Sequence, residues 1–315
     1  AFVARGLDVM NRLANPGLAA LAGVGALQPP LSAYHCGFVL GPRINAGGRV
    51  GEAATGARLL TSDDPAVCDE LARKLDAWNK ERQEMEKACV LQAREQIGDA
   101  PEGRVVMARG EDWHEGVIGI VASRIKDAFD RPSFCFTRGE DGLLKGSARS
   151  MAGFDLGAAV IAARKAGILA KGGGHGMAAG VSVADDRLEA FMEFVEARVA
   201  ESEFARVGVV AQVDLAIPAD RLSVGLIEAF EGLQPFGVGN SRPRVLIHGA
   251  ELLDAEMLKD KQKQPAHLRL SLKGESGRRF KAIAFNVAAS PLPAAAEALK
   301  GGRVELFGTL DIDTW

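Results

Sequence analysis

A long amphipathic segment between residues 65 and 97 constrains the fold of this chain more than any other feature of its sequence. Pro65 suits a first helical turn, and Ser62 or Asp63 is the expected N-cap. The apolar residues recur at helical spacing, with charges opposite them: Val67, Leu71, Leu75, Trp78, Met85 and Cys89. Some 33 residues at 1.5 Å each make a helix of about 50 Å. We therefore expect a connector between parts of a multidomain protein.

The composition is that of a globular protein, with 47% apolar and 25% charged residues among 315. This length predicts two or three domains. No apolar run reaches the roughly 18 residues that span a bilayer, and no secretion signal is visible, so we expect no membrane partner. The four cysteines lie far apart without a C-x-x-C pair. They indicate a reducing cytoplasm rather than a zinc site or a disulfide framework.

Strand and helix patterns alternate between residues 104 and 200. The expected strands are 105–108, 133–137, 144–149 and 181–183, and the expected helices are 117–129, 155–166 and 188–200. This alternation predicts an α/β domain. From residue 208 the pattern changes to short strands at 209–215, 245–253, 267–272, 279–285 and 304–311, with one helix at 219–233. Five such strands predict a β-barrel of the OB type.

We divide the chain into residues 1–60 with an Arg/Gly loop, the connector helix at 61–100, the α/β domain at 101–206, and an OB-like domain at 207–315. Two short helices open the first part. Both ends of the chain fall inside predicted elements, so we expect a fragment, truncated at the C-terminus of the barrel.

Two glycine-rich segments are candidates for phosphate binding. Residues 41–49 form an expected loop in which Arg43, Asn45 and Arg49 could contact phosphates. Structural caps and surface salt bridges are the alternative. In the run 171–180, Gly172, Gly173 and Gly174 can adopt positive φ and turn consecutive N–H groups toward one anion, with His175 at the edge. A plain turn is the alternative there.

Two further segments of the α/β domain carry polar residues suited to phosphate. His114 precedes a glycine-bearing helix whose N-terminus can bind an anion, and Ser123 and Arg124 lie two turns further on. Ser147, Arg149 and Ser150 follow at a strand end. Each could equally be a cap, but their occurrence together with the glycine–histidine run in one domain favours a phosphate site.

The segment 258–281 holds eight basic and two acidic residues. It could bind phosphates through Lys259, Lys261 and Lys263 despite the net charge of −3 for the whole chain. A solvated hairpin face is the alternative. Metal-dependent hydrolysis usually needs clustered Asp and His, and no such cluster is visible in the sequence.

Five motifs in this order resemble the RecJ single-strand-specific DNA exonucleases of the DHH phosphoesterase superfamily. They are Gly41–Arg49, Trp113–Arg124, Ser147–Ser150, Gly172–His175 and Pro235–Asn240. The resemblance covers essentially all of the chain and implies a DHH-associated α/β domain, preceded by the connector helix and followed by the OB domain. Residues 1–60 would be the tail end of the N-terminal DHH region, whose metal ligands would lie upstream of this chain.

The resemblance implies 5′–3′ cleavage of single-stranded DNA to mononucleotides with Mg²⁺ or Mn²⁺, in DNA repair and recombination. For residues 1–315 alone, the resemblance implies that the chain binds single-stranded DNA but neither cleaves it nor holds a metal ion. The candidate residues would hold DNA phosphates, and His175 would stabilise the charge that develops on the scissile phosphate. Single-strand-binding protein and a RecQ-type helicase are further candidate partners. Two alternatives stay open: a phosphodiesterase for dinucleotides or oligonucleotides, and a non-catalytic nucleic-acid-binding module.

Overall fold

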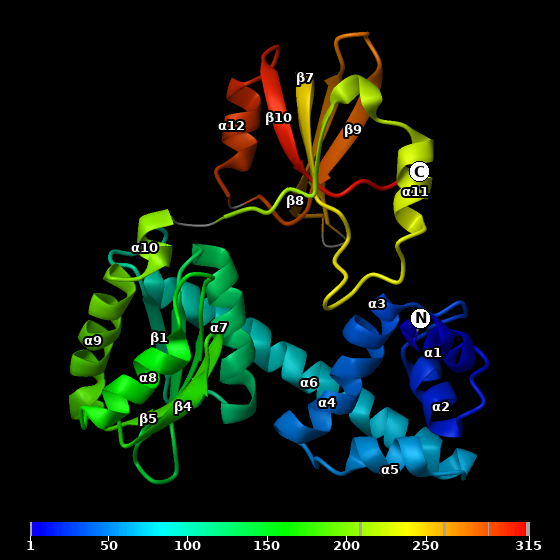
Figure 1. Cartoon of the computed structure of the whole chain (residues 1–315). Coiled ribbons are helices and arrows are strands. Elements are labelled where there is room, and N and C mark those ends of the chain that lie inside the picture. The colour runs from blue at the N-terminus through cyan, green and yellow to red at the C-terminus, as the bar shows by residue number, and fades with distance from the viewer. Residues whose placement is uncertain (1, 208–209, 261–262, 289, 313–315) are drawn as a thin grey trace. The chain divides into compact units, whose positions relative to one another are not determined.

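The computed structural model describes residues 2–207, 210–260, 263–288 and 290–312. The chain forms two compact units, residues 1–210 and 211–315. The first unit joins a helical region to an α/β sheet through one long helix, and the second is a curved β-sheet with helices (Figure 1). None of the described helices is long and apolar enough to cross a bilayer.

The helical region packs on the first half of the long helix α6. Its elements are α1 (Phe2–Met10), α2 (Pro16–Val24), α3 (Ala33–His35), a π-helical turn (Cys36–Leu40), α4 (Gly41–Val50) and α5 (Thr55–Thr61). The loop expected at 41–49 is wrong, because this segment is α4. Its helix is stable despite two adjacent glycines because Ala46 and Gly47 are buried against α6, where a side chain at Gly47 would reach Leu75.

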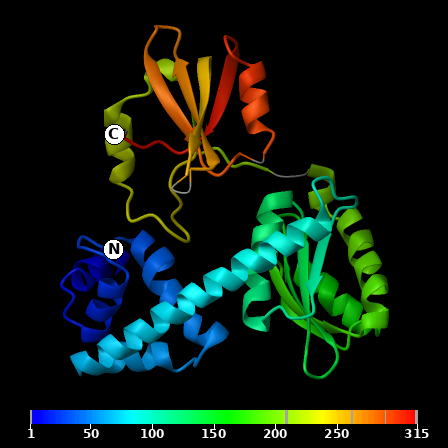
Figure 2. The ribbon, with the colours of Figure 1, turned by 180° about the vertical axis from the view of Figure 1, so that it is seen from behind.

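Helix α6 (Pro65–Ile97) has the length that the sequence predicted, and it connects two hydrophobic cores (Figure 2). Leu71 and Leu75 belong to the core of the helical region, whereas Cys89 and Ala93 belong to a core shared with the sheet. The expected N-cap, Ser62 or Asp63, lies one or two residues before the observed cap. Asp64 is the cap, and its carboxylate accepts a hydrogen bond from the Ala66 N–H at 2.9 Å.

The α/β part is a five-stranded sheet in the order β1-β2-β3-β5-β4. Its elements are β1 (Val106–Gly110), α7 (Glu115–Phe129), β2 (Ser133–Arg138), β3 (Leu144–Arg149), α8 (Leu156–Lys165), β4 (Lys171–His175), β5 (Ala178–Val183), α9 (Leu188–Ala200) and α10 (Glu203–Val207). Strands β1 and β2 are parallel and joined by α7, and the other pairs are antiparallel. Helices α8 and α9 pack on one face, and α7 and α6 pack on the other.

The glycine–histidine run does not form the loop that the sequence predicted. Lys171–His175 is strand β4, at the edge of the sheet and hydrogen-bonded to β5. None of Gly172, Gly173 and Gly174 has a positive φ. The cradle of consecutive N–H groups is therefore wrong, because a strand points successive N–H groups in opposite directions.

The second unit is a curled half-barrel of OB type. Its elements are β6 (Leu215–Pro218), α11 (Val224–Glu231), β7 (Val245–Lys259), β8 (Pro265–Lys273), β9 (Arg279–Ala284), α12 (Leu292–Ala298) and β10 (Arg303–Gly308). Strand β7 pairs with β6 and then β8 along one edge and with β10 along the other. Strand β9 pairs with β8. Among the described residues β9 and β10 are not paired, so the barrel is not closed.

Two expectations for this unit need correction, and one helix was missed. The strand expected at 209–215 begins only at Leu215, and residue 209 lies outside the described residues. The helix expected at 219–233 is shortened to a 3₁₀ turn and α11, because Leu222 and Ser223 are extended and Ser223 caps the helix. Helix α12 was not expected, since its run of alanines carries no apolar period.

Candidate nucleic-acid interface

One face of the sheet gathers several of the predicted residues through strand register alone. Arg149 on β3 pairs with Ala178 on β5, which pairs with His175 on β4. Two residues along, Ser147 pairs with Gly180, which pairs with Gly173. Side chains two apart on a strand share a face, and neighbouring strands lie about 4.8 Å apart. The Arg149 and His175 backbones are therefore about 10 Å apart on the same face.

Helix α7 packs on this face over β2 and β3, whereas Gly180 of β5 and Lys171, Gly173 and His175 of β4 are exposed. Gly119 on α7 lies directly over the candidate residues. A Cβ there would be 2.9 Å from the Arg149 Nη2 and 3.0 Å from the Ser147 Oγ. The glycine thus leaves room for the guanidinium between helix and sheet. The sequence showed this glycine inside an apolar helix but not what it faces.

The guanidinium of Arg149 has no carboxylate partner among the described residues. Its Nη1 donates to the Ser147 Oγ at 3.1 Å and to the Ala148 carbonyl at 2.8 Å. Burial lowers the pKa of Arg149, and the positive charge of Arg49 lowers it further. Because both effects penalise the charged form, an anion bound here would be favoured. Two arginines from α4 and β3 therefore make this spot electropositive.

The end of α4 and the start of α7 meet beside this spot. The Arg49 Nη1 donates to the Gly116 carbonyl at 3.0 Å, and a Cβ on Gly116 would collide with the Arg49 backbone carbonyl. His114 is the N-cap of α7, and its Nδ1 accepts from the Gly116 N–H at 3.0 Å. The cap interpretation of His114 thus fits this geometry, and its ring is exposed at the positive end of the helix.

His175 is exposed at the end of β4. Its Nδ1 accepts a hydrogen bond from the Met177 N–H at 3.3 Å. In the neutral ring the proton is then on Nε2, which points away from this contact and can donate to an anion. The start of α8 packs on the His175 backbone, where a Cβ on Gly157 would lie 3.0 Å from its Cα. This packing holds the strand end in place.

Other predicted residues have partners within the protein. The Arg43 Nε donates to the Asp76 carboxylate at 2.9 Å, and the Arg124 Nε donates to the Glu86 carboxylate at 2.8 Å. Asn45 is exposed on α4, near Arg49 in the sequence. The salt-bridge alternative therefore describes Arg43 and Arg124 in this structure.

Ser123 and Ser150 form hydrogen bonds within the domain, and Gly172 and Gly174 allow close packing of the chain. The Ser123 hydroxyl donates to the Gly119 carbonyl at 3.1 Å. Ser150 is fully buried and donates to the Phe154 carbonyl at 2.8 Å, so it cannot reach a phosphate in this structure. A Cβ on Gly172 would lie 2.8 Å from Val160, and one on Gly174 would collide with the Ala178 carbonyl.

The predicted lysines belong to the second unit. Lys259 ends β7, and Lys263 is exposed in the turn toward β8; Lys261 lies outside the described residues. The outward side of the neighbouring strand β9 carries Arg279 and, beyond its end, Phe285, which is 67% exposed. A cation and an aromatic ring on one edge suit a nucleic-acid strand.

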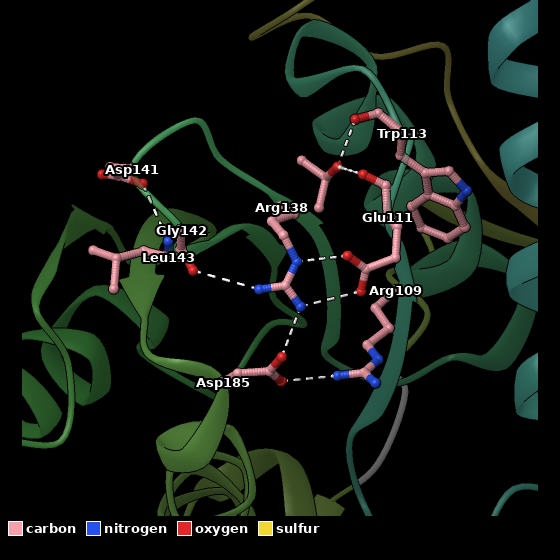
Figure 3. Close-up of polar contacts among 9 residues, drawn as sticks. Arg109, Glu111, Trp113, Arg138, Asp141, Gly142, Leu143 and Asp185 are labelled. Atoms are coloured by element: carbon pink, nitrogen blue, oxygen red, sulfur yellow. Dashed lines mark hydrogen bonds and ion pairs between the residues drawn. The ribbon is translucent and has the colours of Figure 1, made fainter.

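A second group of charges, at the end of β1 and β2, is neutralised internally (Figure 3). Arg138 donates to Glu111 at 2.6 Å and to Asp185 at 2.7 Å, and Arg109 donates to Asp185 at 3.0 Å. The Arg138 contact is the largest cause lowering the pKa of both Glu111 and Asp185. These arginines are thus committed to carboxylates, unlike Arg149.

No group of three or more His, Cys, Asp or Glu among the described residues could hold a metal ion. The side chains described here therefore do not fit a catalytic metal centre, and we derive no step through one.

Two family models match the chain, the DHHA1 domain at residues 102–201 and the RecJ OB domain at 213–315. The single-stranded-DNA-specific exonuclease RecJ of Bacillus subtilis is 32% identical over 286 residues, which cover 89% of this chain and 35% of that protein. RecJ of Escherichia coli is 39% identical over 187 residues, covering 56% of this chain and 32% of that protein.

A crystal structure of RecJ in complex with Mn²⁺ from Thermus thermophilus matches the fold with a TM-score of 0.78 at 30% identity. It aligns with 99% of this chain, which covers 44% of the crystallised one. The chain therefore spans about a third of the length of these curated relatives and less than half of the crystallised one.

Proposed function

Because the chain is related to the RecJ exonucleases and carries a DHHA1 domain and a RecJ OB domain, we propose that it is the substrate-handling part of a 5′–3′ single-stranded-DNA exonuclease. Residues 1–315 would bind single-stranded DNA without hydrolysing it. Phosphodiester hydrolysis by the RecJ-type enzymes that this chain resembles depends on Mg²⁺ or Mn²⁺. Bound ions would supply an activated water.

The observation that carries the proposal is a half-buried guanidinium without a carboxylate partner among the described residues, on the same open face as an exposed imidazole. Arg149 and Ser147 would hold one phosphate, with Arg49 adding positive charge. Arg149, Ala178 and His175 are aligned across β3, β5 and β4. At the β4 side of this row, the His175 Nε2 would donate to a phosphate oxygen and stabilise its negative charge. The half-barrel would guide the strand through Lys259, Lys263 and exposed rings.

Binding of a 5′-phosphorylated, fluorescein-labelled dT 20-mer to residues 1–315 tests the proposal by anisotropy. Hydrogen bonds to charged groups contribute roughly 1.5–3 kcal/mol each, so Arg149→Ala should weaken binding about 10- to 100-fold. Arg198→Ala is the matched control, because Arg198 lies on α9, over the opposite face of the sheet. Affinity should fall steeply with salt.

Three results would contradict the proposal. The first is equal affinity for single-stranded and duplex DNA, and the second is an Arg149→Ala variant that binds like the wild type. The third is robust degradation of the oligonucleotide by residues 1–315 with Mn²⁺ that a chelator abolishes, which would refute binding without cleavage. Comparing a dinucleotide with a 40-mer as substrates of the full-length enzyme separates an exonuclease from a small-substrate phosphodiesterase.

A further inference from the structure

Two glycines on the open face of the sheet have no packing role. Gly173 and Gly180 pair across β4 and β5, beside Ser147. Among the described residues, a Cβ on Gly173 would meet no atom within 4 Å, and one on Gly180 would meet only the Gly146 carbonyl at 4.0 Å. Neither has a positive φ. Larger residues would therefore fit at both positions, and strands generally favour them.

Gly172 and Gly174 differ from this pair, because a side chain at either position would lie on the opposite face and collide with α8 or β5. The fold thus explains two glycines of the run and leaves the bare pair Gly173 and Gly180 unexplained. Glycine within a strand often marks the place where a ligand approaches the backbone closely.

A groove of about 360 Å³ lies over this bare pair. Its lining includes Ser147 at one end and Lys145, Ser182 and Lys171 at the other, with Glu115 and Ile118 of α7 along the side. Ser182 on β5 pairs with Lys145 on β3 and with Lys171 on β4. These three residues therefore form a row across the same face, two residues along the strands from the row of Ser147, Gly180 and Gly173. Two residues along a strand correspond to about 6.7 Å, which is similar to the separation of adjacent phosphates in an extended nucleic-acid strand.

The charges of this row suit a second phosphate. The Lys145 Nζ donates to the Asp141 carboxylate at 2.6 Å and lies 3.5 Å from the Ser182 Oγ. Asp141 therefore offsets the charge of Lys145 while holding it beside the groove. Lys171 is exposed and has no ion-pair partner among the described residues, so it supplies the charge that is not neutralised. Glu115 opposes an anion from the α7 side.

We propose that this groove is a subsite for the nucleotide adjoining the phosphate at Ser147 and Arg149. The sugar would lie flat on Gly173 and Gly180, and its next phosphate would bind Lys171 and Lys145, with the buried Ser182 hydroxyl behind Lys145. The inference rests on the proposed function, because it assumes a nucleic-acid strand anchored at Arg149. It adds Lys145, Lys171 and Ser182, which the sequence did not single out. It also explains Gly173 and Gly180 as places where the ligand contacts the strands, instead of as parts of a phosphate-binding loop.

Gly173→Val and Lys171→Ala test the subsite in residues 1–315, with a 5′-phosphorylated dT 10-mer as the probe. Gly173→Val should fold with an unchanged or raised urea midpoint, since its side chain enters open space, yet bind the 10-mer at least 10-fold more weakly. Lys171→Ala should weaken binding about 3- to 10-fold and reduce the slope of log affinity against log salt by about 0.7, the value for one single-strand phosphate contact. Lys165→Ala, at the end of α8 on the other face, is the charge-matched control.

The outcomes separate this inference from the proposed function. If Arg149→Ala weakens binding while Gly173→Val and Lys171→Ala bind like the wild type, the subsite is refuted and the phosphate site stands. If Arg149→Ala has no effect either, the proposed function itself fails. A lowered urea midpoint for Gly173→Val would show that the glycine has a structural role, which contradicts the argument from open space.

Discussion

Replacing Glu86 by alanine should strongly destabilise the first unit. The Glu86 carboxylate lies between two arginines: the Arg82 Nη1 donates to it at 2.7 Å and the Arg124 Nε at 2.8 Å. Arg82 and Glu86 are both buried, with side chains 10% and 12% exposed, and the Arg82 Nε has no hydrogen-bond partner among the described residues. Removing the carboxylate takes away the ionic partner of Arg82 and leaves its Nη2 donating to the Asn79 side chain at 3.1 Å.

Breaking a buried ion pair from one side costs about 3–5 kcal/mol. The Arg124 contact adds little, because that side chain is 62% exposed. We therefore expect a loss of about 3 kcal/mol in the free energy of unfolding, at the lower end of that range. With an m-value of about 2.5 kcal/mol/M, the urea midpoint should fall by about 1.2 M.

Tryptophan fluorescence during urea unfolding measures this change in a Trp315→Phe background, which leaves Trp78 and Trp113 of the first unit as reporters. Glu84→Ala, an exposed position on the same helix, should shift the midpoint by less than 0.3 M and serves as the control. The double variant Arg82→Met/Glu86→Leu should recover most of the loss, since it removes both charges of this buried pair. A Glu86→Ala midpoint within 0.3 M of the wild type, or a double variant as unstable as the single one, would refute this reasoning.

Three further predictions concern stability and reactivity. Asp64→Ala should cost about 1 kcal/mol through loss of the α6 cap; a change in the first unit's urea unfolding of less than 0.3 kcal/mol would count against it. The pKa values of Glu111 and Asp185 are lowered by Arg138, so their contribution to stability is complete above the ordinary carboxyl pKa of about 4 and is lost as the pH falls below it. Arg138→Met should make urea midpoints between pH 2.5 and 6 less dependent on pH, and an identical pH dependence in both proteins would contradict this. Burial raises the pKa of Cys135 to about 12, so it should resist iodoacetamide at pH 8 in the folded protein and react after unfolding, as peptide mass spectrometry would show.

Features that depend on neighbours along the chain were predictable from the sequence. The apolar period predicted α6 itself, and Pro65 with a nearby cap predicted its start to within two residues, because helical spacing and capping are local properties. Strand β3 and helix α9 have the bounds that the alternation predicted. The family resemblance agrees with the DHHA1 and RecJ OB matches.

Features that depend on distant partners were not predictable. Residues 41–49 contain glycines that suggest a loop, yet burial against α6 makes them helical. The run 171–175 is a strand because β5 supplies its hydrogen bonds. Sequence alone could not show that Arg43 and Arg124 have carboxylate partners while Arg149 has none among the described residues.

The sequence by itself determined the long connector helix and the α/β alternation, because periodicity acts over a few residues, and it supplied the candidate phosphate-binding residues as a prediction. Only the tertiary structure decided which of those residues share a face. Strand register places Arg149, Gly173 and His175 together, and it is set by pairing between segments that are far apart in the chain.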